Sequence, residues 1–140
     1  MPRSSAEIAD SIAMFQPQDG EWLKLDELLE ELFQSESPPA AMDALLHVFQ
    51  RFPTEDGAGV FWGIVHGLES LPDYEERLIQ SVRAEPSEFG IIMLHRLLNS
   101  GVEDVGGVGL RFVIESTVKN ESVADEVRAR ARKFMDSWKG

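Results

Sequence analysis

The sequence predicts an all-α protein of about seven or eight helices. Apolar residues recur at spacings of three and four through most of the 140 residues, which is the periodicity of amphipathic helices. Breaks that contain proline or glycine separate these stretches, and helix pairs recur at roughly 30–45 residues, as in α-solenoids. The length fits one domain, residues 1–140, built either as a HEAT- or armadillo-like α-solenoid or as an irregular helical bundle.

The most informative stretch is residues 58–71, predicted to form one helix around a stripe of Phe61, Ile64, Val65, Leu68 and Leu71. Gly59, Gly63 and Gly67 recur every four residues and therefore align along one side. Each interior glycine costs a helix about 1 kcal/mol relative to alanine. We therefore expect a neighbouring helix to approach closely on that side, while Trp62, His66 and Glu69 occupy another side.

Three helices are expected before this stretch, and they cover residues 5–14, 21–34 and 40–52. Ser4 or Ser5 can cap the first of them. The apolar face of the second begins with Trp22, and its opposite face is acidic. A turn over residues 53–57 ends the series, with Asp56 available to cap the glycine-containing helix.

Two further helices follow. Pro72 begins one whose inner stripe contains Tyr74, Leu78 and Val82, with acids in its first turn that complement the helix dipole. Ser87 or Glu88 begins another that runs to Asn99, and Gly101 is placed to cap its carboxyl end.

The last third of the chain contains the least certain element. Residues 102–109 are expected to be a flexible loop, and residues 110–118 fit either a strand, because they are rich in β-branched residues, or a helix, which their helical context favours. The final helix is expected to begin with Ser122 as N-cap and Asp125 in the capping-box position. Its outer face is basic and contains Arg128, Arg130, Arg132 and Lys133.

Acidic residues are concentrated in the first half of the chain. The formal net charge is −12, of which residues 1–58 contribute −9, residues 59–100 contribute −3 and residues 101–140 contribute nothing. Direct nucleic-acid binding is disfavoured because phosphate contacts need clustered bases. A basic protein is the natural complement, although acidity also serves solubility alone.

The charge on the second helix forms a ridge opposite its apolar face. Asp26 and Glu30, like Glu27 and Glu31, are like-charge pairs four residues apart, and each pair costs the helix a few tenths of a kcal/mol. We interpret the ridge as a candidate partner surface, with a solvated face as the alternative. The full set of candidate partner-binding residues is Asp26, Glu27, Glu30, Glu31, Glu55, Asp56, Trp62, His66, Glu69, Asp73, Glu75 and Glu76.

Catalysis and metal binding have little support in the residue pattern. His66 and Glu69 are three residues apart and His95 recurs in a similar context 29 residues after His66, but the paired motifs of zinc and di-iron sites are missing. Cysteine and nucleophile-elbow motifs are also missing. We therefore expect no enzyme activity, no metal and no cofactor. His66 and His95 are instead expected to form hydrogen bonds at helix–helix contacts, whereas His47 lies off the apolar face of its helix and is expected at the surface. If the chain is a solenoid, Trp62, His66, Glu69 and His95 line one surface.

Location is expected to be cytoplasmic. No apolar run reaches the roughly 20 residues that a membrane span needs, and the first residues lack the apolar core of a signal peptide. The missing cysteines suit a reducing compartment.

Residues 55–101 carry a family resemblance. The stretches DGAGVFWGIVHGLESLPDYEERLIQSV and PSEFGIIMLHRLLNSG are similar to the small all-helical immunity proteins of bacterial polymorphic toxin systems, which accompany contact-dependent, Rhs and type VI effectors. The resemblance implies a cytosolic, non-enzymatic protein that binds a cognate toxin domain and occludes it. Many such toxins are nucleases with basic clefts, which an acidic ridge would complement.

Two other functions stay open. A HEAT-like adaptor or regulatory module would bind a host peptide or subunit. A small helical enzyme would need a His and Glu cluster in a deep pocket. The sequence identifies neither the toxin, nor its activity, nor the oligomeric state.

Overall fold

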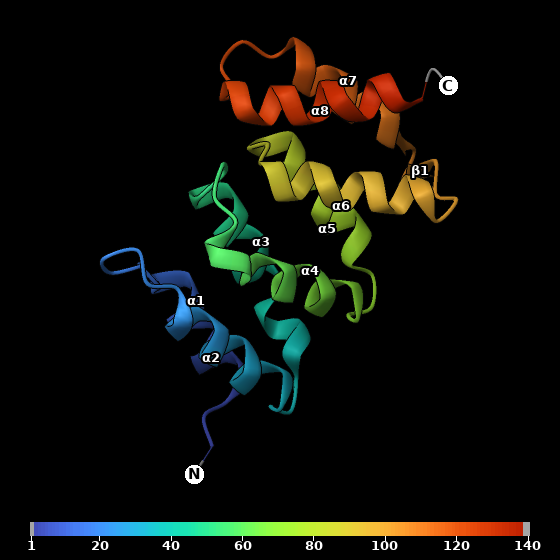
Figure 1. The fold of residues 1–140 in the computed structure, drawn as a ribbon. Coiled ribbons are helices and arrows are strands. Elements are labelled where there is room, and N and C mark those ends of the chain that lie inside the picture. The colour runs from blue at the N-terminus through green and yellow to red at the C-terminus, as the bar shows by residue number, and fades with distance from the viewer. Residues whose placement is uncertain (1, 139–140) are drawn as a thin grey trace. The chain divides into compact units, whose positions relative to one another are not determined.

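The computed structural model describes residues 2–138 and confirms the all-α prediction (Figure 1). Eight α-helices and two short 3-10 helices account for most of these residues, together with a two-stranded hairpin. The elements are α1 (Ser5–Met14), α2 (Leu23–Phe33), η1 (Pro38–Ala41), α3 (Met42–Arg51), η2 (Gly57–Gly59), α4 (Phe61–Glu69), α5 (Tyr74–Ala84), α6 (Glu88–Asn99), β1 (Asp104–Val105), β2 (Val108–Gly109), α7 (Leu110–Lys119) and α8 (Asp125–Ser137).

The contacts divide the chain into two compact units. Unit 1 comprises Met1–Val48 and Asp56–Tyr74, and unit 2 comprises Phe49–Glu55 and Glu75–Gly140. Unit 1 therefore contains α1, α2, α4 and most of α3, whereas unit 2 contains nearly all of α5 and the whole of α6, α7 and α8.

Unit 1 is organised by the parallel packing of α2 and α4. A Cβ atom at Gly63 would lie 3.3 Å from Leu29, and one at Gly67 would overlap the ring of Phe33. Because both contacts advance by one helical turn in the same direction, the two helices run parallel. The expected close approach on the glycine side is thus confirmed for Gly63 and Gly67.

The expected start of the glycine-containing helix was wrong. Helix α4 begins at Phe61, and Gly59 lies before it with φ +91°, in a conformation that only glycine adopts readily. Asp56 caps a different element, because its carboxylate accepts the N–H of Ala58 at 3.0 Å within η2. Gly59 therefore serves a turn and is not part of the packing stripe.

The aromatic core of unit 1 surrounds Trp22. Its indole lies 5.7 Å from the Phe15 ring and 5.4 Å from the Phe61 ring, the second contact being edge-to-face. Helix α1 begins as expected, with a capping box between Ser4 and Glu7. The neighbouring α1 and α2 are seen at the amino-terminal end of the chain in Figure 1.

Unit 2 repeats the parallel relation with α6 and α8. Glu88 at the start of α6 meets Arg130 of α8 at 3.4 Å, and two turns later His95 stacks on Phe134. Helix α6 is capped by Ser87, as expected. Gly101 ends it in a Schellman motif, in which the N–H of Val102 reaches the carbonyl of Leu97 at 3.0 Å.

Residues 110–118 are helical, as their context favoured, and form most of α7, which lies beside α8 (Figure 1). The loop expected at residues 102–109 contains a small hairpin instead, with Val105 paired to Val108. Gly106 and Gly107 have φ values of +58° and +82°, which is the backbone of a type I′ turn. The two glycines therefore build the hairpin and are not a sign of an unstructured loop.

The expected capping box of the last helix was also wrong. Helix α8 begins at Asp125 with Ala124 as its N-cap. Ser122 is held before the helix because its N–H and hydroxyl both donate to Asn120 Oδ1, at 3.0 and 2.6 Å. This turn uses the side chain that was expected to cap the helix.

Alanine substitutions at the two packing glycines of α4 test the α2–α4 contact. We expect Gly67→Ala to destabilise the protein by about 1–3 kcal/mol, because the methyl group must displace the Phe33 ring. Gly63→Ala should change stability by less than half as much, because its contact is wider and alanine favours the helix by about 1 kcal/mol. Urea unfolding followed by circular dichroism measures both free energies, and a G67A variant as stable as G63A would contradict this packing.

Candidate protein-binding surface

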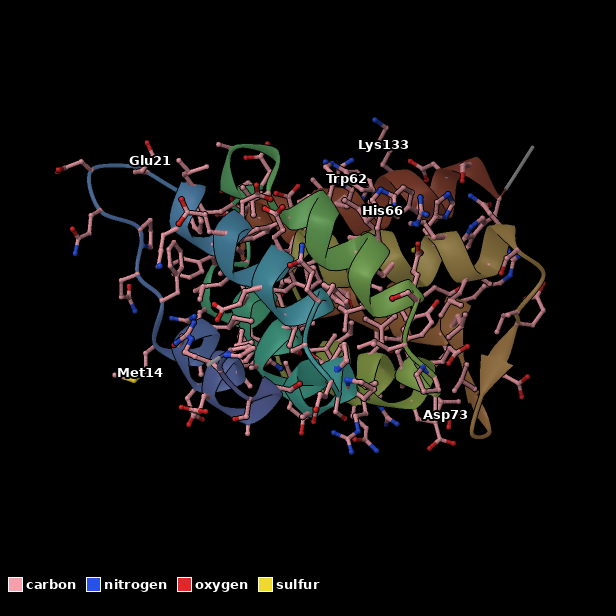
Figure 2. The ribbon with its side chains drawn as sticks, turned by 90° about the horizontal axis from the view of Figure 1, so that it is seen from below. Met14, Glu21, Trp62, His66, Asp73 and Lys133 are labelled. Atoms are coloured by element: carbon pink, nitrogen blue, oxygen red, sulfur yellow. The ribbon has the colours of Figure 1, made fainter. Side chains whose placement is uncertain are left out.

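One flank of α4 carries three polar or aromatic side chains, which we call the α4 strip: the exposed Trp62 and His66 and the half-buried Glu69. Trp62 is 40% exposed, and its ring centroid lies 6.3 Å from that of His66. His66 Nδ1 lies 4.0 Å from Glu69 Oε1. Figure 2 shows Trp62 and His66 projecting from successive turns of α4. The exposure of both side chains, which the sequence left open, is thus established.

The α4 strip is rigidly backed. Phe61, Ile64 and Leu68 are fully buried on the opposite side of the same helix, and the glycine side is held against α2. A side chain on such a support loses little backbone freedom when it binds a partner. Trp62 is therefore suited to act as an anchor, since tryptophan contributes a large apolar area with few rotatable bonds.

The acidic ridge of α2 is divided into exposed and paired members. Asp26, Glu27 and Glu30 are exposed, and Lys24 approaches Glu27 at 3.9 Å. Glu31 is half-buried and bound by Arg3 through two hydrogen bonds of 2.9 and 2.6 Å.

Glu31 has a structural role within unit 1. Arg3 joins it to α1, because the same guanidinium also donates to Ser11 at 2.8 Å. The hydrogen bonds from Arg3 lower the pKa of the Glu31 carboxyl. The part of the ridge without an ion pair among residues 2–138 is therefore narrower than the sequence suggested, and it is centred on Asp26 and Glu30.

The other candidates lie near the ends of helices. Glu55 and Asp56 are exposed in the turn between α3 and α4. Asp73 is exposed before α5 with φ +58°, so it precedes the first turn of that helix rather than belonging to it. Glu75 is half-buried and Glu76 is exposed in that first turn. Of these five, only Asp56 and Asp73 belong to unit 1.

The division into units sharpens the charge asymmetry. By sequence, unit 1 contains thirteen acidic and two basic side chains, a formal charge of −11. Unit 2 contains twelve acidic and eleven basic side chains, a formal charge of −1. Nearly all of the net negative charge thus belongs to the unit that also carries the α4 strip, because the acids of unit 2 are balanced by its bases.

His95 lies in a different environment from His66. Its ring stacks on Phe134 with centroids 3.9 Å apart and planes 4° apart. Its Nδ1 is buried without a hydrogen-bond partner among residues 2–138. Burial lowers the pKa of this imidazole, so the neutral ring is favoured. The expected helix–helix contact is confirmed for His95, but the expected hydrogen bond is replaced by aromatic stacking. The same expectation was wrong for His66, whose side chain is exposed.

Metal-binding clusters are also addressed by the structure. Within the described part of the chain, no group of three or more His, Cys, Asp or Glu side chains is arranged to hold a metal ion. His66 and Glu69 lie close together, but no third His, Cys, Asp or Glu side chain of the described residues completes a metal-binding group with them.

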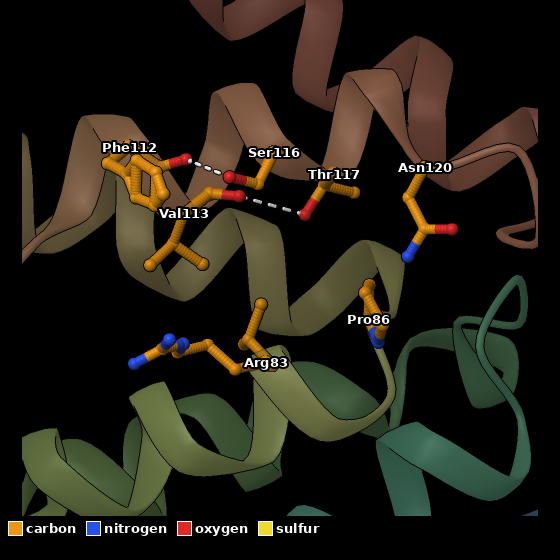
Figure 3. Close-up of a pocket in the computed structure, with 8 residues that line it drawn as sticks. Arg83, Pro86, Phe112, Val113, Ser116, Thr117 and Asn120 are labelled. Carbon is orange, nitrogen blue, oxygen red and sulfur yellow. Dashed lines mark hydrogen bonds between the residues drawn. The ribbon is translucent and has the colours of Figure 1, made fainter.

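Unit 2 contains a groove that the sequence did not indicate. It has a volume of about 190 Å³ and lies between α5 and α7 (Figure 3). Phe112, one of its lining residues, is 61% exposed. The sequence contained one signal for this groove: Phe112 is apolar but lies off the buried stripe of α7. That signal depends on residues 110–118 being helical, which the sequence alone did not decide.

Comparison with known proteins gives no indication of function, so the functional argument depends on the surface residues. No protein-family model, curated protein sequence or solved structure matches this chain. In the part of the chain that the structure describes, none of the helices has the length and apolar character required to cross a membrane.

The half-buried His95, with its buried Nδ1, leads us to predict that stability depends on pH. Its folded pKa is lowered, so the unfolded chain binds this proton more readily. The contribution of neutral His95 is therefore complete above about pH 6.5, the ordinary histidine value, and decreases as the pH falls below it. His95→Phe keeps an aromatic ring against Phe134 without titrating, so we expect wild type to lose stability relative to H95F between pH 7 and 5.5. Urea unfolding at each pH measures this difference, and parallel curves would contradict the prediction.

Proposed function

We propose that this chain is an immunity protein that neutralises a cognate toxin domain by covering a basic surface with unit 1. The observation that carries the proposal is the charge of −11 on unit 1 against −1 on unit 2. Charge gathered in this way on one compact unit creates a directional field that steers a basic partner. The family resemblance of residues 55–101 supports the same role.

The acidic ridge supplies the electrostatic part of the proposed contact. Asp26 and Glu30 are exposed one helical turn apart on α2, where like charges oppose each other by a few tenths of a kcal/mol. A cationic partner placed over them removes that repulsion and adds attraction. This contact would raise the association rate more than the residence time.

The α4 strip supplies the short-range part. Trp62 offers an exposed aromatic face on a rigid helix, and His66 packs at its side. Large aromatic side chains that become fully covered at the centre of an interface account for much of the binding free energy. Trp62 would therefore govern dissociation, while the acids govern association.

A helical adaptor is the second candidate. The parallel pairs α2–α4 and α6–α8 resemble the packing of helical-repeat modules, which bind peptides or subunits. This function would give a stable host partner and a deletion phenotype in a strain without any toxin gene.

Identification of the partner decides between the two candidates. A tagged full-length chain, recovered from its own host and analysed by mass spectrometry, should carry a basic toxin domain, and co-expression should rescue cells from that toxin. Recovery of a host subunit and failure to rescue from neighbouring toxins would contradict the immunity role and favour the adaptor.

The proposed role of the acidic ridge predicts an effect on the association rate constant. With the isolated partner, we expect the association rate constant of Asp26→Asn/Glu30→Gln to fall several-fold at low salt and to converge with wild type at 0.5 M NaCl. Asp104→Asn/Glu121→Gln is the matched control, since it removes the same two charges from exposed sites of unit 2. Stopped-flow or surface-plasmon measurements give both rates, and equal slowing by the two double variants would contradict a surface on unit 1.

The proposed role of Trp62 as an anchor predicts an effect on the dissociation rate of the complex. Trp62→Ala should weaken the complex by about 2 kcal/mol or more, mainly through faster dissociation, because a covered aromatic anchor is lost. The folded state should tolerate the change, since the side chain is 40% exposed. Met14→Ala removes another exposed apolar side chain of unit 1, 80% exposed, and should leave dissociation unchanged. Identical dissociation of W62A and wild type would exclude Trp62 as the anchor.

A further inference from the structure

The groove of unit 2 has an apolar floor and two unlike walls. Its floor consists of the buried side chains Val82, Val113 and Thr117. One wall follows α7 through Phe112, Ser116 and Asn120, and the other consists of Arg83 and Pro86 from α5 and its carboxyl-terminal connection (Figure 3). All eight lining residues belong to unit 2.

The two hydroxyl groups of the groove donate hydrogen bonds to backbone carbonyls of their own helix. Ser116 Oγ donates to the carbonyl of Phe112 at 2.8 Å, and Thr117 Oγ1 donates to the carbonyl of Val113 at 3.0 Å. They therefore leave the groove without hydroxyl donors and with an apolar central section, to which Thr117 also contributes its methyl group.

The ends of the groove carry strong donors. Asn120 Oδ1 accepts two hydrogen bonds from Ser122, which fixes the amide orientation and leaves its NH₂ group to donate; in Figure 3 the amide nitrogen points towards Pro86. Within residues 2–138, the guanidinium of Arg83 has no ion-pair partner. In Figure 3 it extends towards the Phe112 end. A cation and an amide donor thus lie at opposite ends of a groove whose floor is apolar.

We propose that this groove binds a short extended segment of a partner protein, with an apolar side chain on the floor and a carboxylate at Arg83. The carboxylate complements a cation that has no ion-pair partner within residues 2–138, and a backbone carbonyl of the segment can accept a hydrogen bond from Asn120. Phe112, 61% exposed, covers the apolar side chain from above. The site lies in unit 2 and does not depend on the acidic surface of unit 1.

The dimensions favour a peptide over a small molecule. Phe112 lies on α7 and Asn120 directly follows its last residue, eight positions further on, so the wall is about 12 Å long. An extended segment of about four residues covers this length. In such a segment alternate side chains face the same side, so the apolar residue and the acid stand two positions apart. The volume of about 190 Å³ is below the roughly 300 Å³ at which enclosed small-molecule pockets begin.

Nuclear magnetic resonance of the full-length chain tests the proposal. The ¹⁵N-labelled protein is titrated with a library of end-blocked hexapeptides in which one leucine, valine or phenylalanine stands two positions from one aspartate or glutamate, in either order. We expect the best peptides to shift the amide resonances of Val82, Val113, Ser116 and Thr117. Replacing the acid of such a peptide by its amide should weaken binding about tenfold.

Matched variants separate the groove from general electrostatics. Arg83→Gln should weaken the acidic peptide about tenfold and the amide peptide hardly at all, and Phe112→Ala should weaken both. Lys133→Gln removes the same charge from an exposed site of α8 and should leave binding unchanged. Because Arg83 and Phe112 are exposed, both variants keep the folded spectrum against which shifts are read.

Three outcomes would overturn the proposal. The first is that no library member shifts the groove resonances at millimolar concentration. The second is that R83Q binds the acidic peptides as tightly as wild type. The third is that octanoate, a small amphipathic carboxylate, shifts these resonances while every peptide fails, which would assign the groove to a small ligand.

Discussion

Helix α4 can lie against α2 only where its own side chains are absent. Gly63 and Gly67 provide that space one turn apart, so Leu29 and Phe33 of α2 pack directly over the α4 backbone. This contact fixes the rotation of α4 about its axis. Once the glycine side faces α2 and Phe61, Ile64 and Leu68 face the core, Trp62 and His66 lie on the remaining flank, where both side chains are exposed. The packing constraint therefore determines which side chains the surface of unit 1 offers.

Unit 2 solves the same problem with different residues. Gly90 near the start of α6 is buried, and a Cβ there would lie 2.8 Å from Val82, so this glycine lets α5 and α6 approach. Further along α6, an aromatic stack replaces the glycine contact, with His95 flat against Phe134 of α8. The stack leaves Nδ1 of His95 buried and without a partner in the described residues. A desolvated polar atom is a cost that unit 1 avoids by keeping His66 outside.

Much of the fold could be predicted because helical periodicity and local capping act over a few residues. The span and serine cap of α1, the Ser87 cap and the Gly101 end of α6 all follow from side chains within one turn of the helix end. The errors arose where one residue type has two uses. Glycine at 59 and at 106–107 supplies positive φ, while glycine at 63 and 67 supplies space, and spacing alone does not separate these uses. Ser122 could equally cap a helix or close a turn with Asn120.

The candidate surfaces differ in how far the sequence could reach them. The acidic ridge follows from helical spacing. The pairing of Glu31 with Arg3, which removes Glu31 from the ridge, joins residues 28 positions apart and depends on the packing of α1 on α2. The groove of unit 2 is formed by residues of both α5 and α7, so the sequence of neither helix alone predicts it. The consequence is a chemical contrast: unit 1 offers carboxylates around an exposed indole, whereas the groove of unit 2 offers a guanidinium and an amide around an apolar floor. Because a basic surface suits the first and an acidic segment the second, the two sites select different parts of a partner and need not compete for the same one.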